Sequence, residues 1–304
     1  MLDLSRLRAL HAVAVHGSVG AAATALGYTP SAVSQQIAKL ERETRTPLLE
    51  RQGRGIALTD AAQQLAATAE ELLAMVERAE TDLEERRGRP AGRLTIASFA
   101  TGARGLLPAV LATLAAEHPT LDTRIVEADP HLSPGLVAQG VVDLAVTHDW
   151  DIAPMSSPEG LAQTGIGEDY CDICVPDDHP YAARDALTRA DLAGQRWICQ
   201  PPGSVCYDWL TRTLRASGPP DLAYQVAEYE TQLALVAAGL GIALVPRLGR
   251  GPLPAGVTAV RLDPPPTRHV YALWRPGAAR RPAITEAVRL LKSTWAERHA
   301  SIPA

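Results

Sequence analysis

The stretch 29–40 carries polar side chains on one side of an expected helix and apolar side chains on the other. The apolar positions repeat at steps of four and three, as a buried helix face does: Val33, Ile37 and Leu40. Hydroxyl, amide and ammonium groups on the outer side suit hydrogen bonding to base edges and phosphates in a DNA major groove. The candidates for such contacts are Thr29, Ser31, Ser34, Gln35, Gln36 and Lys39. A polar helix face is also common on proteins that bind no nucleic acid, so this stretch alone leaves both interpretations open.

The residues before this helix predict a shorter helix that crosses it closely. Ala21 and Ala22 give the shorter helix a narrow apolar face, and Gly27 follows it, where a left-handed residue ends a helix most easily. Thr29 is suited to cap the next helix, with Pro30 at its first position, where a missing N–H costs nothing. Two helices in this order predict a helix-turn-helix over residues 18–41.

A small β-hairpin is expected next, in the segment 48–59. Two short apolar pairs flank a Gln-Gly-Arg-Gly turn, which predicts a wing that carries Arg51 and Arg54. Two arginines beside a recognition helix can reach phosphates or the minor groove. The alternative is a solvated hairpin tip without a DNA contact.

A long helix is expected from Thr59 to about Arg86, because this segment contains neither Pro nor Gly. Its apolar residues alternate steps of three and four, as in a coiled-coil seam: Ala62, Leu65, Ala69, Leu72, Val76, Ala79 and Leu83. The regular seam favours pairing with a second copy, which would place two reading heads on two DNA half-sites. The alternative is a helix that lies on its own domain. The Gly- and Pro-containing segment 87–92 then predicts a hinge.

Strand and helix patterns alternate after the hinge, which is typical of a mostly parallel sheet covered by helices. We expect a first unit with strands at 93–98, 123–127 and 142–147 and helices at about 105–118 and 134–139. We expect a second unit from Ile166, with strands at 170–176, 196–199, 223–227 and 241–246 and helices at 204–217 and 231–239. The strand 269–274 and the helix 282–298 have no partner in the second unit, so we place them on the first.

Composition sets the broad class of the protein. The 304 residues are 46% hydrophobic and 21% charged, as in ordinary soluble proteins. The net charge of −5 argues against a protein that coats nucleic acid without specificity, but it allows a small basic reading head on an acidic body. The sequence has no run of about 18 apolar residues and no signal peptide, so we expect no membrane association and a cytoplasmic location.

The four cysteines do not form a recognisable metal set. Cys171 and Cys174 make a CxxC within an apolar segment, which favours a buried strand, because no second CxxC or His pair accompanies it. Cys199 and Cys206 allow a redox pair, although small buried hydrophobes are the favoured interpretation in the cytoplasm.

No catalytic motif is apparent in the chain. Asp177, Asp178 and His179 resemble metal ligands, but they sit in a Pro-bounded turn without further ligands. Gly239-x-Gly241 precedes a strand and lacks the third Gly of a dinucleotide site. We therefore expect no enzyme, metal or cofactor.

Residues 4–60 resemble the DNA-binding domain of LysR-type transcriptional regulators. The matching positions are Gly17-Ser18, Ala22-Ala23, Leu26, Ser31 to Ile37, Leu40-Glu41, the LLER of 48–51 and Leu58-Thr59. The chain departs from the family pattern at packing or turn positions of this region, namely Thr46, Leu49 and Gln63. Further matches to the family lie in the segments 177–182, 191–198 and 230–246.

The resemblance implies a fold and a division of the chain. It implies an α-helical winged helix-turn-helix domain (1–58), a linker and dimerisation helix (59–86) and a hinge (87–92). A two-lobed α/β effector domain of the type 2 periplasmic-binding-protein kind (93–304) would follow. Lobe I comprises 93–165 and 267–304, and lobe II comprises 166–266. The family implies a homodimer or a dimer of dimers on double-stranded promoter DNA, with a small, often carboxylated effector and contact with RNA polymerase.

Ligands of such two-lobed folds bind between the lobes, at strand ends and helix N-termini, where free N–H groups favour anions. By position in the chain, the effector-binding candidates are Ser98, Phe99, Thr101, Thr147, His148, Ser204, Thr231 and Pro246. Arg104 is a candidate for positive charge. Each hydroxyl residue among them is equally suited to be an ordinary helix cap.

Overall fold

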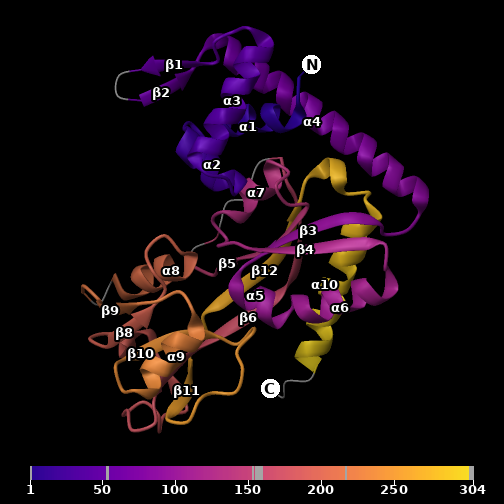
Figure 1. Ribbon diagram of the computed structural model, residues 1–304. Coiled ribbons are helices and arrows are strands. Elements are labelled where there is room, and N and C mark those ends of the chain that lie inside the picture. Colours follow the sequence, from indigo (N-terminus) through magenta and orange to yellow (C-terminus); the bar gives the residue numbers. More distant parts are fainter. Residues whose placement is uncertain (1, 53–54, 153, 155–159, 216–217, 301–304) are drawn as a thin grey trace.

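The computed structural model describes residues 2–52, 55–152, 154, 160–215 and 218–300. Figure 1 shows three parts: an N-terminal helical head, one long helix that leads away from it, and a two-lobed α/β body that contains the C-terminus. This arrangement confirms the expected fold class.

The head consists of three helices and a two-stranded wing: α1 (Leu4–His16), α2 (Val19–Leu26), α3 (Pro30–Thr44), β1 (Leu49–Gln52) and β2 (Gly55–Leu58). Each helix begins at a side chain that accepts a backbone N–H: Asp3, Ser18 and Thr29. Gly27 ends α2 in the left-handed region, at φ 66°, where a side chain would be strained. Capping at these positions therefore sets the helix-turn-helix geometry that the sequence predicted.

The wing is held to α3 by one carboxylate. Glu41 Oε1 accepts the backbone N–H groups of Leu48, at 2.8 Å, and of Leu49, at 3.1 Å. Leu48 is buried in the same core as Val33 and Ile37. The start of the wing is thus fixed relative to the recognition helix by both packing and hydrogen bonds.

The long helix α4 (Asp60–Arg87) uses its apolar seam in two ways. Ala62 and Ala69 are buried in the core of the head, and Leu65 and Leu72 pack against it. The first half of the seam therefore lies on its own domain, which corrects the expectation of one continuous dimer seam. Farther along, Met75 and Leu83 are each 58% exposed.

Lobe I is one half of a large sheet with helices on both faces. Its strands are β3 (Gly92–Ser98), β4 (Leu121–Glu127), β5 (Leu144–Trp150) and β12 (Thr267–Trp274), with the first part of β6 (Ala162–Pro176). Its helices are α5 (Ala100–Gly105), α6 (Leu107–Glu117), α7 (Ser133–Ala138), η3 (Pro276–Ala278) and α10 (Pro282–Ala300). Helices α6 and α10 share one core cluster with β3, whereas α7 packs in a separate cluster.

Lobe II continues the sheet through the same long strand. It contains β7 (Ala186–Leu187), η1 (Arg189–Leu192), β8 (Arg196–Cys199), α8 (Val205–Leu214), β9 (Asp221–Gln225), α9 (Tyr229–Ala237), β10 (Ile242–Pro246) and β11 (Val257–Leu262). Strand β6 pairs with β12 through residues 162–170 and with β10 through residues 171–174. One strand therefore runs through both lobes, and the expected lobe boundary at 165/166 falls inside it.

Two expected helices differ from the observed ones for local reasons. The helix expected at 105–118 begins only at Leu107, as α6, because a separate short helix, α5, ends before it at Gly105. A Cβ there would lie 2.5 Å from the backbone nitrogen of Gly249, so a loop of lobe II approaches the chain at the break. Helix α9 begins at Tyr229 rather than at Thr231, because the Glu228 side chain caps it.

The head and the long helix contact lobe I directly. His16 of α1 is hydrogen-bonded to Gln139, just after α7. Arg281 binds Glu84 of α4 at 2.9 Å and Asp143 at 2.6 Å. The head is therefore attached to lobe I near α7, and the long helix is attached to it near the start of α10.

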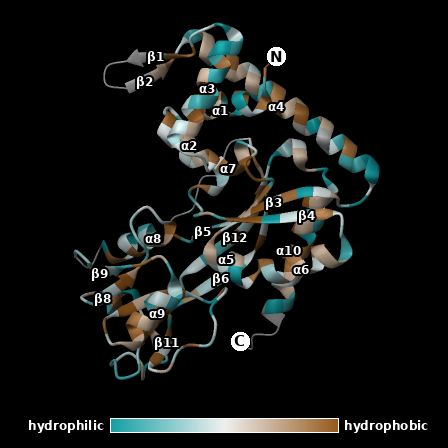
Figure 2. Cartoon of the chain, viewed as in Figure 1, coloured by the Kyte–Doolittle hydropathy of each residue, from teal (hydrophilic) through white to brown (hydrophobic). Residues whose placement is uncertain are grey.

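Figure 2 shows hydrophobic residues along the helices and strands of the head and the body, and the buried ones form the core clusters of these parts. Among the described residues, no single helix is long and apolar enough to span a membrane. Helices Leu4–His16 and Val19–Leu26 are together long and apolar enough for a span, but they are bent by 119° relative to each other.

Candidate DNA-binding face and interlobe cavity

The outer face of α3 is polar and accessible along its length. Ser31, Ser34, Gln35 and Lys39 are exposed, and Gln36 is half-buried. Thr29 is exposed but its hydroxyl already accepts the N–H of Ala32 at 3.2 Å and lies 3.0 Å from the Ser31 hydroxyl, so it acts first as the helix cap. The face that the sequence predicted is therefore free to meet a partner.

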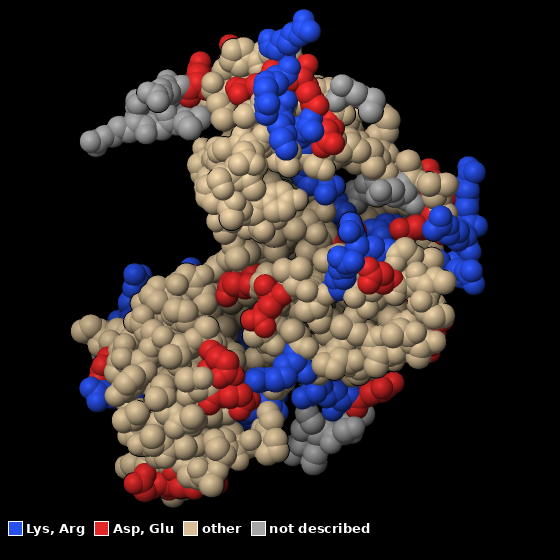
Figure 3. All heavy atoms as spheres, viewed as in Figure 1, with Lys and Arg blue, Asp and Glu red and all other residues tan. Residues whose placement is uncertain are grey.

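Two further cations extend this face at the end of α3. Arg42 and the C-cap residue Arg45 are exposed, like Lys39. Figure 3 shows Lys and Arg side chains gathered on the head. The spacing of three between Lys39, Arg42 and Arg45 was the sequence signal that would have revealed them. Of the predicted wing arginines, Arg54 lies outside the described residues, and only the backbone of Arg51, in β1, is described.

A cavity of about 460 Å³ lies between the two lobes. Lobe I contributes the segments 99–104 and 127–130 with His148 and Arg268, and lobe II contributes Gln200, 204–206 and 227–229. Its size falls in the range of small-molecule sites. Both lobes thus contribute walls to this site.

A buried ion pair lies at the floor of this cavity. Arg268 of β12 and Asp169 of β6 are direct cross-strand neighbours, and their side chains are 1% and 3% exposed. Arg268 Nε donates to Asp169 at 3.0 Å and Nη2 donates to Thr101 Oγ1 at 3.0 Å. Burial opposes the charge of Arg268, but the Asp169 carboxylate outweighs it and raises the pKa of the guanidinium. The arginine is therefore a fixed cation with its own counterion.

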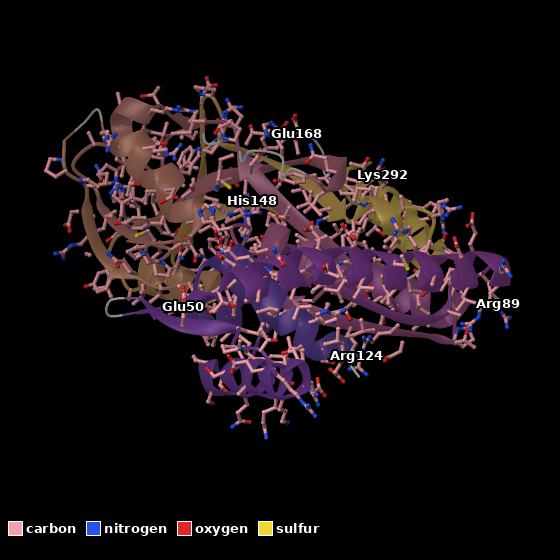
Figure 4. The ribbon with its side chains drawn as sticks, turned by 90° about the horizontal axis from the view of Figure 1, so that it is seen from above. Glu50, Arg89, Arg124, His148, Glu168 and Lys292 are labelled. Atoms are coloured by element: carbon pink, nitrogen blue, oxygen red, sulfur yellow. The ribbon has the colours of Figure 1, made fainter. Side chains whose placement is uncertain are left out.

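His148 lies beside this pair, in the interior of the body (Figure 4). Burial, and then the charge of Arg268, hold the pKa of His148 well below its ordinary value of 6.5. The neutral ring places Nε2 3.4 Å from Arg268 Nη1, and its edge meets Phe99 with ring centroids 4.6 Å apart. His148 is therefore a neutral wall residue of the cavity.

The N-terminus of α9 is occupied by a carboxylate of the chain itself. Glu228 accepts the N–H of Glu230 at 2.9 Å, and the N–H and hydroxyl of Thr231 at 2.6 and 2.8 Å. Burial opposes its charge, but these hydrogen bonds prevail and lower the pKa of Glu228. Arg104 lies 3.8 Å from Glu228 and 3.0 Å from Glu230. A position that sequence reasoning reserved for an anionic ligand is thus already filled.

The structure brings four of the predicted effector residues to the cavity: Phe99, Thr101, His148 and Ser204. The other four do not line it: Ser98, Thr147, Thr231 and Pro246.

The reasons for the four absences are local. Thr147 precedes His148 on a strand, so the two point to opposite faces. The Ser98 hydroxyl is buried and donates to the Phe99 carbonyl at 3.2 Å. Thr231 is bound to Glu228, and Pro246 is buried at the end of β10.

Arg104, the predicted positive charge, lines the cavity, but the other charged residues of the site were not predicted from the sequence. Arg268 and Asp169 are 99 positions apart, and only the pairing of β12 with β6 brings them together. Glu127 and Asp129 also line the cavity, at and just after the end of β4. Charged residues within predicted strands were the only local signal for the buried pair, and they do not show which strands become neighbours.

The cysteines occupy two environments. Cys171 and Cys174 are buried in β6, as the sequence predicted, and burial raises the pKa of Cys174 to about 12. All four thiols are free. Cys206 lines the cavity and its sulfur accepts the Tyr229 hydroxyl at 3.4 Å, while burial raises the pKa of its thiol.

Among the described residues, one group has carboxylate and imidazole atoms close enough to hold a metal ion: Glu117, His118 and Glu286. Arg289 already binds Glu286, at 2.6 and 2.9 Å, which leaves little capacity for a metal there. The turn containing Asp177 and His179 uses these side chains for Thr258 and the backbone of Tyr181.

A winged helix-turn-helix head, a long linking helix and a two-lobed body with an interlobe cavity define a ligand-responsive DNA-binding regulator. The family model described as the LysR substrate binding domain matches residues 87–296. The model described as the bacterial regulatory helix-turn-helix protein, lysR family, matches residues 4–63. The chain belongs to the LysR family and is a DNA-binding transcriptional regulator whose second domain binds a small-molecule effector.

Individual relatives agree with this assignment. The chain is 29% identical over 301 residues to the probable HTH-type transcriptional regulator LrrA of Synechococcus elongatus, covering 97% of this chain and 98% of LrrA. It is 27% identical to the DNA-binding transcriptional dual regulator OxyR of Escherichia coli, with 95% of each chain covered. Full-length OxyR from Pseudomonas aeruginosa has the same fold, with a TM-score of 0.66, 21% identity and coverage of 96% of this chain and 95% of that one.

Proposed function

We propose that this regulator reads promoter DNA with the outer face of α3 and that occupancy of the interlobe cavity changes this binding. The observation that carries the proposal is the polarity of α3: Gln35 and Lys39 are exposed, whereas Ile37 between them is completely buried. Ser31, Ser34, Gln35 and Gln36 would contact bases, and Lys39 would contact phosphate. Arg51 and Arg54 of the wing would contact the sugar-phosphate backbone of the DNA.

The parts of the chain would divide the work. Residues 1–58 bind DNA, 59–86 pair two copies, 87–92 act as a hinge, and 93–304 bind the effector. Exposed Met75 and Leu83 on α4 support pairing, because large apolar side chains on one helix face favour a second copy. A homodimer or a dimer of dimers would place several heads on promoter DNA, beside RNA polymerase in the cytoplasm.

The experiment begins with the unknown operator. Binding sites are selected from random double-stranded DNA with the full-length protein, and the affinity of Gln35→Ala is then measured on the selected site and on random duplex. We expect a loss of about 1–3 kcal/mol on the selected site and little change on random DNA. Gln64→Ala, an exposed change on α4, is the matched control. Equal losses on both DNAs would refute base reading by α3.

A second candidate is regulation by a redox signal. Cys206 faces the cavity beside Tyr229, and relatives 27% identical to this chain are named hydrogen peroxide-inducible genes activators. The raised pKa of the Cys206 thiol weighs against it, since the thiolate is the reactive form. Footprints of oxidised and reduced protein on the selected DNA test it. The redox candidate requires a difference that disappears in Cys206→Ser.

A further inference from the structure

We propose that the effector of the interlobe cavity is a small organic cation, an amine or guanidinium on an apolar body, rather than the carboxylate that the family resemblance implied. The inference rests on the proposed function of the cavity as the effector site. It follows from how the charges around the cavity are already paired.

Both cations that line the cavity have carboxylate partners. Arg268 is neutralised by Asp169 in a pair from which water is excluded. Arg104 lies between Glu228 and Glu230, at 3.8 and 3.0 Å. An anionic ligand would have to displace one of these partners and leave a carboxylate without its counterion, which is costly away from water.

The two longer helices that begin at the cavity, α8 and α9, have N-termini that groups of the chain already satisfy. The Glu228 carboxylate binds two N–H groups and a hydroxyl at the start of α9. Ser204 caps α8, and Asp208 lies in the first turn of that helix. The third helix that begins at the cavity, α5, has no side-chain cap at Phe99, but it spans only six residues. Polar and negative groups of the chain therefore already meet the dipoles of the two longer helices, α8 and α9.

Two carboxylates of the cavity wall have no such counterion. Glu127 and Asp129 line the cavity from the end of β4, and neither forms an ion pair with any residue that the structure describes. His131 donates its backbone N–H to Asp129 at 3.1 Å, while its side chain lies 3.4 Å from Asp208. Burial raises the pKa of Asp129, so its ionised form gains most from a cation nearby. In Figure 3, acidic side chains gather beside the junction of the two lobes.

The remainder of the wall suits an apolar body. Phe99, Ala100, Ala103, Pro130 and Val205 surround the polar groups. A volume of about 460 Å³ accommodates an aromatic ring with a short chain. The expected ligand therefore places its cation near Glu127 and Asp129 and its apolar part across the cavity.

Three probes with one phenylpropyl body separate charge from shape: 3-phenylpropylamine, 3-phenylpropionate and 3-phenylpropanol. Their Kd values are measured by calorimetry on the full-length protein, together with footprints on the selected DNA. We expect the amine to bind at least about tenfold more tightly than the propionate. The double variant Glu127→Gln, Asp129→Asn should lose about tenfold for the amine, and Asp178→Asn, which removes an exposed charge elsewhere, should lose nothing. Glu228→Gln should improve binding of the propionate.

Tighter binding of the propionate or the alcohol than of the amine overturns the inference but leaves the cavity as the effector site. Failure of the amine to bind at millimolar concentration also overturns it. A different result bears on the proposed function alone: if the amine binds with the expected dependence on Glu127 and Asp129 but no footprint changes, the ligand class stands and regulation through this cavity is refuted.

Discussion

Arg268 and Asp169 face each other across the ladder between β12 and β6 and form an ion pair whose side chains are 1% and 3% exposed. Burying two charges is costly unless each is matched and hydrogen-bonded. Asp169 also accepts the backbone N–H of Leu248 at 2.8 Å, and Arg268 donates to Thr101 at 3.0 Å. The pair therefore ties β6, β12, α5 and the loop after β10 together beneath the cavity.

Removing one partner of this buried pair should destabilise the protein far more than removing one partner of an exposed pair. Asp169→Asn leaves the Arg268 charge buried and uncompensated, so we expect a loss of about 3–5 kcal/mol in the free energy of unfolding. Urea denaturation of the full-length protein measures it. The control is Asp221→Asn, because the Arg196–Asp221 pair has side chains 59% and 55% exposed and should contribute about 1 kcal/mol or less. Equal losses in the two variants would contradict the prediction.

His148 should make stability depend on pH. Its pKa in the folded protein lies well below 6.5. As the pH falls below 6.5, the imidazole is therefore protonated in the unfolded chain while it stays neutral in the folded one. Stability should therefore fall as the pH falls, by about 1.4 kcal/mol per pH unit between about pH 6 and 5. Denaturation curves of wild type and His148→Gln at several pH values isolate the contribution of His148 to the pH dependence of the free energy of unfolding. This contribution should be missing from the variant. Parallel pH profiles would show that folding does not lower the pKa of His148.

The limits of sequence reasoning follow the range of the interactions. The helix-turn-helix was predictable because its signals are local: Ser18 and Thr29 cap helices within three residues of themselves, and Gly27 ends one. The polar face of α3 needed only helical periodicity. The first half of the α4 seam was assigned to a partner copy because the same apolar spacing serves a domain core or a dimer.

The cavity was less predictable because its charges pair over long distances. Arg268 and Asp169 become neighbours only through strand register, which no local pattern encodes. Thr231 was a reasonable hydrogen-bond donor by position, but Glu228 caps the helix three residues earlier and binds its hydroxyl at 2.8 Å. A candidate donor at a helix N-terminus is thus informative only when the capping side chain is known.

Glu41 should determine how firmly the wing is attached. Its carboxylate accepts two backbone N–H groups at 2.8 and 3.1 Å, and Glu41→Ala would leave both without that partner. We expect a loss of about 1–3 kcal/mol in the free energy of unfolding and weaker binding to all DNA, because the wing cations lose their position. Glu70→Ala, an exposed change on α4, is the control. Unchanged DNA affinity in a destabilised Glu41→Ala would separate the wing's attachment from its proposed role.

Lys39 should act through charge rather than through base reading. It is exposed on α3 beside Arg42, on the side away from buried Ile37 and Leu40. Lys39→Ala should therefore weaken binding to selected and random DNA by a similar factor, and the slope of log affinity against log salt should decrease by about 1. Titrations at several salt concentrations measure both effects. Lys292→Ala is the control, because it removes the same charge from α10. The Lys292 ammonium donates to Thr164 in the body and does not lie on the head, so the salt slope of this variant should match that of wild type. If Lys39→Ala lost affinity only on the selected site, with an unchanged salt slope, Lys39 would be reading a base and not a phosphate.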